Sequence, residues 1–144
     1  MAGLIEFQKR VAKINITTMF DQIIKEQEQE ILQLNKDQLL EGKNIKNQKI
    51  KPKYKSQAYA KRKARQNSKP GNGTPDLYLS GGLHNSEYLK KKGSAFVPEF
   101  NTPYSKFVLA RYDDVAGWNN EAEKQRNEII SKELIQDIRT TLKI

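Results

Sequence analysis

Two stretches with a helical repeat of apolar residues, one near each end of the chain, limit the folds that this sequence can adopt. In the first stretch, apolar residues recur at spacings of three and four, which predicts a long amphipathic helix from about 18 to 41. Thr18 and Asp21 form the pattern of a capping box, and Gly42 stands where a helix commonly ends. A shorter repeat upstream predicts an additional N-terminal helix that packs on this helix or on a neighbouring molecule; its members are Leu4, Phe7, Val11 and Ile14.

The second repeat occupies the C-terminal stretch. Asn120 and Glu123 give a helix-start pattern, with acidic residues in the first turn and basic residues near the end, as the helix dipole favours. An apolar ladder with a spacing of four predicts a helix through this stretch; its members are Ile130, Leu134, Ile138 and Leu142.

Turn and strand signals fill the segment between the two helical repeats. The stretch NSKPGNGTP contains prolines and glycines that interrupt any regular element there. Gly93 can take the positive φ of a tight turn between two segments with strand preference, which predicts a β-hairpin with strands at about 83–91 and 95–100. Pro103 can open a short helix that ends before a corner at Gly117.

This order of elements predicts the α+β class. We expect a long N-terminal helix and a C-terminal helix packed on a small antiparallel β-sheet or hairpin, with an extended basic arm. The chain has 144 residues, the length of a single domain, 1–144. Within it we distinguish N-terminal helices (1–42), a basic arm or insertion (43–75), and the sheet with the C-terminal helices (76–144).

The basic arm carries the excess charge of the chain. The net charge is +9, and the segment 43–69 contains eleven Lys or Arg and no Asp or Glu. Lysines alternate with other residues around Pro52, which predicts an exposed extended segment, followed by helix formers at 57–66. Such a segment can hold phosphates and stack on bases, or it can meet an acidic protein surface, and composition leaves both open. The candidate binding residues are Lys49, Lys51, Lys53, Tyr54, Lys55, Lys61, Arg62, Lys63 and Arg65.

Catalytic and metal-binding patterns are weak. There is no cysteine and only one histidine, His84, which excludes disulfides, thiolate nucleophiles, zinc fingers and multi-histidine sites. Asp76, Glu87 and Lys90 have the residue types of a metal-dependent nuclease. In a strand, however, two residues three apart point to opposite faces, so Glu87 and Lys90 would diverge. We therefore expect no enzyme, no catalytic residue, no metal and no cofactor; we also expect no transmembrane segment or signal peptide.

The order of these features resembles the head-tail joining or tail-completion (neck, connector ring) proteins of tailed bacteriophages. It is similar to versions in crAss-like and other Bacteroidetes phages, and the resemblance spans nearly the whole chain. Two segments carry it, DLYLSGGLHNS and YSKFVLARYDDVAGWNN. The residues that match the pattern of that family are Asp76, Leu77, Leu79, Ser80, Gly81, Gly82, Leu83, Ser86, Tyr112, Gly117 and Trp118.

The first of these segments has the composition of a turn that enters a sheet. We expect the three leucines to anchor the core and Gly81 and Gly82 to form the turn. Asp76 and Ser80 are expected to fix that turn by local hydrogen bonds.

The resemblance implies a structural virion protein. Such a protein forms a homo-oligomeric ring below the portal, bridges capsid and tail, and contacts portal, adaptor and tail proteins at the head-tail interface, after synthesis in the host cytoplasm. Its basic arm would contact genomic DNA without reading sequence, or it would dock on an acidic surface of the portal or tail; the sequence leaves both open. The alternative hypothesis is a small basic protein that binds nucleic acid independently of sequence, and the third is the metal-dependent nuclease.

Overall fold

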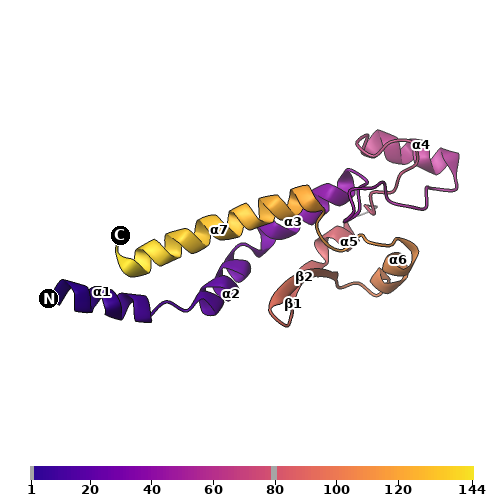
Figure 1. The fold of residues 1–144 in the computed structure, drawn as a ribbon. Helices are drawn as coiled ribbons and strands as arrows, with labels where there is room; N and C mark the ends of the chain where they lie inside the picture. Colours follow the sequence, from indigo (N-terminus) through magenta and orange to yellow (C-terminus); the bar gives the residue numbers. More distant parts are fainter. Residues whose placement is uncertain (1, 79–80) are drawn as a thin grey trace.

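The computed structural model describes residues 2–78 and 81–144, which form seven helices and one antiparallel hairpin (Figure 1). The C-terminal helix packs against the N-terminal helices, and the predicted α+β class is confirmed. The elements in chain order are α1 (Ala2–Ala12), α2 (Ile16–Glu26), α3 (Glu28–Leu40), α4 (Gln57–Gln66), α5 (Gly82–Asn85), β1 (Glu87–Lys92), β2 (Ala95–Phe100), α6 (Ser105–Arg111) and α7 (Asn120–Leu142).

The single long helix predicted from 18 to 41 is wrong, because two helices, α2 and α3, meet at Gln27. The capping box is also wrong: Asn15 caps α2, and its side-chain oxygen accepts a hydrogen bond from the backbone N–H of Thr18 at 3.1 Å. Each helix buries an adjacent aliphatic pair, Ile23 and Ile24 in α2 and Ile31 and Leu32 in α3. The turn between the helices lets both pairs reach the interior.

The end of α3 agrees with the prediction that a helix ends at Gly42. Gly42 has a φ of +72°, and the N–H of Lys43 donates to the carbonyl of Gln38 at 3.0 Å, which is the hydrogen bond of a Schellman motif. A Cβ at position 42 would lie 2.8 Å from side-chain atoms of Pro70 and Thr74. Only glycine fits here without strain, because the positive φ and the close approach act together.

The helix α7 runs along α1, α2 and α3 (Figure 1). Its N-cap is Asn119, one residue before the predicted cap, since the side chain of Asn119 accepts from the N–H of Ala122 at 3.0 Å. The four members of the predicted apolar ladder are half-buried along its length. The helix therefore packs on the N-terminal layer with part of its apolar stripe still open.

The hairpin lies beside α3. Strand β2 has the predicted bounds, but the predicted strand 83–91 is wrong at its start, because residues 82–85 form the short helix α5. Gly81, with a φ of +86°, takes the left-handed conformation that turns the chain into α5. The N–H of Leu89 donates to a carboxylate oxygen of Glu28 at 3.0 Å, and the rings of Phe20 and Phe96 lie 5.9 Å apart. The N-terminal half of the helical layer thus holds the hairpin.

The predicted basic arm is anchored to the folded body: residues 51–53 and 55 are exposed without regular structure, and the predicted helix formers at 57–66 form α4. Ile50 is buried in a core cluster with Leu39, Leu83, Phe100 and Val115. The backbone of the segment is tied down as well: the N–H of Ile50 donates to the carbonyl of Gly42 at 2.8 Å, and the N–H of Tyr54 donates to that of Gly73 at 2.9 Å.

The molecule is elongated (Figure 1). Both chain ends and α1 lie at one end, and α4, α5 and α6 lie at the other. The helix α1 reaches the end of α7, where a guanidinium nitrogen of Arg10 donates to the carbonyl of Leu142 at 3.4 Å. Across the helices of the described ranges, none combines the length and the apolarity that crossing a membrane requires.

Candidate functional site

Asp76 lies at the centre of a buried polar network. Its carboxylate is 3.0 Å from the ammonium of Lys63, and both side chains are almost completely buried. It also accepts a hydrogen bond from the side chain of Asn67 at 3.0 Å and from the N–H of Tyr78 at 3.0 Å. The ammonium of Lys63 donates to the carbonyl of Tyr78. Asp76 thereby attaches α4 to the turn. The local bond with Tyr78 was expected, and the bonds with Lys63 and Asn67 were not.

His84 belongs to the same network. Its Nε2 atom lies 3.0 Å from the carbonyl oxygen of Asp76, and its ring stands edge-on to the ring of Tyr78 at 5.2 Å. Burial lowers the pKa of His84 below its ordinary value. The neutral ring therefore donates from Nε2 to the carbonyl and stabilises the turn.

The other residues of the first segment surround this network. Leu83 is buried in the core cluster and Leu77 packs against it, so two of the three expected anchors are in place. Leu79 and Ser80 lie outside the described residues. The hydroxyl of Ser86 donates to the carbonyl of Leu83 at 2.7 Å and closes α5. Gly82 begins α5, so only Gly81 has the conformation of a turn glycine.

The corner after α6 is attached to α3 by amide side chains. The Nδ2 atom of Asn35 donates to the carbonyl of Gly117 at 2.6 Å, and the Nε2 atom of Gln38 donates to the same oxygen at 3.2 Å. The indole N–H of Trp118 donates to the carbonyl of Ile31 at 3.2 Å. Tyr112 packs against the core cluster. These bonds fix the place where α7 begins.

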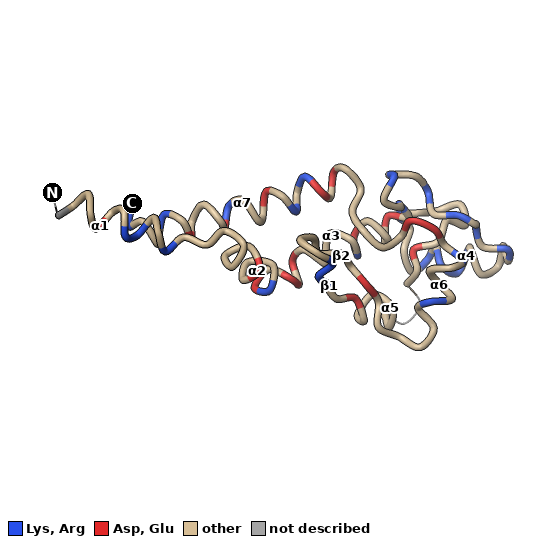
Figure 2. The backbone as a smooth tube through the Cα atoms, turned by 60° about the horizontal axis from the view of Figure 1, so that its bottom comes forward, with Lys and Arg blue, Asp and Glu red and all other residues tan. Residues whose placement is uncertain are grey.

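The basic residues gather at the end of the molecule that carries α4 (Figure 2). Tyr54 is half-buried, and Lys63 is buried against Asp76, so Lys63 does not belong to a free binding surface. The remaining predicted residues are exposed: Lys49, Lys51, Lys53, Lys55, Lys61, Arg62 and Arg65.

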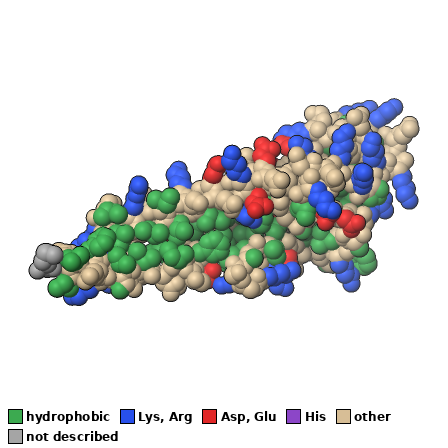
Figure 3. Space-filling model, viewed as in Figure 1, with side chains coloured by type: hydrophobic (Ala, Val, Ile, Leu, Met, Phe, Trp, Pro, Cys, Tyr) green, Lys and Arg blue, Asp and Glu red, His purple; other side chains and the backbone are tan. Residues whose placement is uncertain are grey.

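The opposite end of the molecule carries a large exposed apolar surface. Figure 3 shows hydrophobic side chains in a continuous field over α1, α2 and α7. The large apolar side chains that α1, α2 and α7 leave exposed each keep at least 40% of their accessible area. We call this set of side chains the apolar face; its members are Leu4, Ile5, Phe7, Val11, Ile16 and Ile135.

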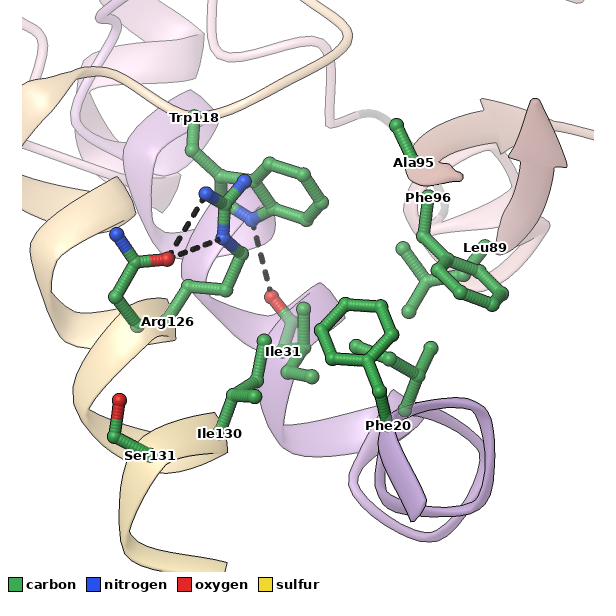
Figure 4. A pocket seen from close by; sticks show the side chains of 11 residues that line it. Phe20, Ile31, Leu89, Ala95, Phe96, Trp118, Arg126, Ile130 and Ser131 are labelled. Atoms are coloured by element: carbon green, nitrogen blue, oxygen red, sulfur yellow. Dashed lines mark hydrogen bonds between the residues drawn. The ribbon is translucent and has the colours of Figure 1, made fainter. Parts of the chain in front are cut away.

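An apolar pocket of about 300 Å³ lies between α2, α3, the hairpin and α7 (Figure 4). Phe20, Ile31 and Phe96 contribute apolar walls. The guanidinium of Arg126 lies over the indole ring of Trp118, 4.7 Å from the ring centre (Figure 4). The pocket is open in the single chain, next to the layer that bears the apolar face.

Glu87 and Lys90, two residues of the nuclease hypothesis, lie in different environments. Glu87 is buried, and neither of its carboxylate oxygens has a hydrogen-bond partner among the described residues. Burial raises the pKa of Glu87 to about 8. Lys90 is exposed and pairs with Glu99 at 3.8 Å. Within residues 2–78 and 81–144, no three His, Asp or Glu side chains converge in a way that could hold a metal ion.

Sequence patterns reveal one of these two apolar features and not the other. The apolar repeat of α1 was visible, and packing on a neighbour was one of its two expected uses. The pocket was not visible, because it joins residues from five elements between Phe20 and Ser131. The burial of Lys63 and Glu87 was equally hidden, since both residue types are normally solvated.

Comparison with known proteins gives no relative: no protein-family model, no curated protein and no solved structure matches this chain.

Proposed function

We propose that this protein is a structural subunit of the head-tail connector ring of a tailed bacteriophage, located below the portal between capsid and tail. The observation that carries the proposal is the apolar face, which the single chain leaves in solvent. Its partners would be identical subunits and the portal, adaptor and tail proteins of the same virion. The proposal gives the protein no catalytic role.

The total exposed area supports self-association. The chain exposes 9594 Å². A compact monomer of 16.6 kDa exposes only about 7,600 Å², so the surplus is about 2,000 Å². A subunit in a ring makes two contacts, and a standard contact buries about 800 Å² on each partner. The surplus is therefore close to the area that two ring contacts would cover.

The helix α1 supports the same conclusion. It has 11 residues, a length at which an isolated helix is marginal in water. Leu4, Phe7 and Val11 form one stripe along it, yet all three remain exposed in the single chain. Their burial by a neighbour would supply the packing that stabilises such a helix. Head-to-tail contacts of this kind close into rings when the rotation between subunits allows it.

The test is the mass of the purified protein at near-physiological salt, measured by light scattering after size exclusion. We expect an assembly of many subunits. Ile135→Asp should dissociate it, because the substitution places a charge in the buried contact. The control is Gln136→Asp, at the next position of α7, which is also exposed. On a helix this position faces away from the apolar ladder of α7, so the substitution should leave the assembly intact. Equal masses for the two variants and the wild type, or a monomeric wild type, would refute the proposal.

A second candidate function is sequence-independent binding of nucleic acid. The observation that favours it is the set of exposed lysines and arginines at the α4 end (Figure 2). Such binding weakens steeply as salt rises, because each phosphate contact releases a counterion. Substitution of Lys49, Lys51, Lys53 and Lys55 by Gln should reduce both the affinity for duplex DNA and its salt dependence. A monomer that binds DNA and joins no portal or tail protein would favour this candidate over the ring.

A further inference from the structure

A second cleft, of about 380 Å³, lies at the α4 end of the molecule, away from the apolar face. Leu77, Leu83 and Val108 contribute aliphatic side chains to its lining, and Pro75 and Gly82 also line it. Five of the six tyrosines of the chain line it, although they are spread over 59 positions of the sequence: Tyr54, Tyr59, Tyr78, Tyr104 and Tyr112.

The tyrosines present both ring surfaces and hydroxyl groups. Tyr54 and Tyr59 stand edge to face, with ring centres 4.9 Å apart and planes at 89°. Tyr78 and Tyr104 keep more than 40% of their accessible area. Burial raises the pKa of Tyr54 above its ordinary value, so its hydroxyl stays protonated. The cleft thus offers flat apolar surfaces with neutral donors.

Positive charge borders the cleft. The guanidinium of Arg62 lies 5.0 Å from the ring centre of Tyr59, and that of Arg111 lies 5.6 Å from the ring centre of Tyr112. Both arginines are exposed. Among the residues that the structure describes, none that lines the cleft is acidic. A ligand with planar rings and negative charge therefore matches both features of the site.

We propose that the tyrosine-lined cleft binds unstacked bases of single-stranded nucleic acid, with Arg62 and Arg111 contacting the adjoining phosphates. Aromatic platforms beside a basic track are the usual means of holding single strands without reading sequence. Bases paired in a duplex present only their edges and cannot enter such a cleft. The described part of the lining comes from helices and loops and offers no strand edge to which an extended peptide could add by backbone pairing.

This inference deepens the second candidate function by naming the form of nucleic acid and the place where it binds. It does not depend on the ring. The two are separable, because duplex binding tests the basic surface, single-strand binding tests the cleft, and assembly mass tests the ring.

The experiment measures fluorescence anisotropy with a labelled oligothymidine of about 12 nucleotides, within the usual site size of such proteins. Tyr104→Leu should weaken binding about tenfold, because it removes a stacking surface. Tyr104→Phe keeps the ring and should bind like the wild type. Tyr88→Leu changes the sixth tyrosine, which lies on the hairpin and outside the cleft, and it should also leave binding unchanged.

Three further probes distinguish base stacking from contact with phosphates alone and from binding of a peptide. An abasic strand of the same length should bind about tenfold more weakly than oligothymidine, as should the matching duplex. Equal affinity for the abasic strand and oligothymidine, or no loss in Tyr104→Leu, would overturn the proposal. Binding of a proline-rich acidic peptide in competition with oligothymidine, and more tightly than it, would also overturn it and would assign the cleft to a protein partner.

Discussion

The pair formed by Lys63 and Asp76 is the residue-scale contact on which the α4 end depends. Both groups are almost completely buried, so removing one leaves the other as an uncompensated buried charge. Lys63→Met should lower the free energy of unfolding by about 3 to 5 kcal/mol in urea denaturation. Lys61→Met, at an exposed position of the same helix, should change it by less than about 0.5 kcal/mol. Similar small losses in both variants would show that the network does not hold α4 in place.

Glu87 is a buried carboxyl whose ionisation opposes folding. Its pKa is raised from 4.5 to about 8, so the folded state holds the proton more tightly than the unfolded chain does. The contribution of Glu87 to stability is full below about pH 4.5 and is lost as pH rises through about 8. Within that window the loss approaches about 1.4 kcal/mol per pH unit. Glu87→Gln should therefore gain stability relative to the wild type as pH rises.

The measurement is urea denaturation of the wild type and Glu87→Gln between pH 5 and pH 9. Glu128→Gln, at an exposed position of α7, serves as the control and should follow the wild-type profile. Parallel profiles for the wild type and Glu87→Gln would mean that Glu87 is solvated or paired in the folded protein.

At the scale of elements, the junction after α3 depends on one glycine. Gly42 and Gly93 both have a positive φ, but only at Gly42 would a Cβ meet other atoms, Pro70 and Thr74 at 2.8 Å. Gly93→Ala should cost only the conformational strain of the turn, about 1 to 2 kcal/mol. Gly42→Ala should cost more, because Pro70 and Thr74 must also move. Thermal unfolding of the two variants compares these costs directly, and an equal or smaller loss for Gly42→Ala would show that Pro70 and Thr74 do not pack closely on Gly42.

The sequence predicts the elements well where one local signal decides them. The terminal helices have a clear apolar period, and Gly93 marks the hairpin turn, so β2 and α7 appear close to their predicted bounds. The break at Gln27 has no such signal, since neither proline nor glycine is present there, and tertiary packing decides it. The burial of Lys63 depends on Asp76, 13 positions later, and the charge pattern of the segment gave no sign of it. The tyrosine-lined cleft is likewise a product of the fold.

At the scale of the whole molecule, apolar and basic surfaces lie at opposite ends (Figures 2 and 3). This polarity fits a subunit that associates through one end and presents positive charge at the other. A ring built through the apolar face would bring the basic ends of many subunits together. The combined field would then act on a polyanion more strongly than the field of one chain does.

The most direct test of the connector proposal is a concentration series of the wild-type protein in light scattering at near-physiological salt. A closed ring has a fixed number of subunits, so we predict that the mass rises to one plateau and stays there. A mass that equals one chain at every concentration would contradict the account, and so would a mass that grows without limit, which indicates an open filament.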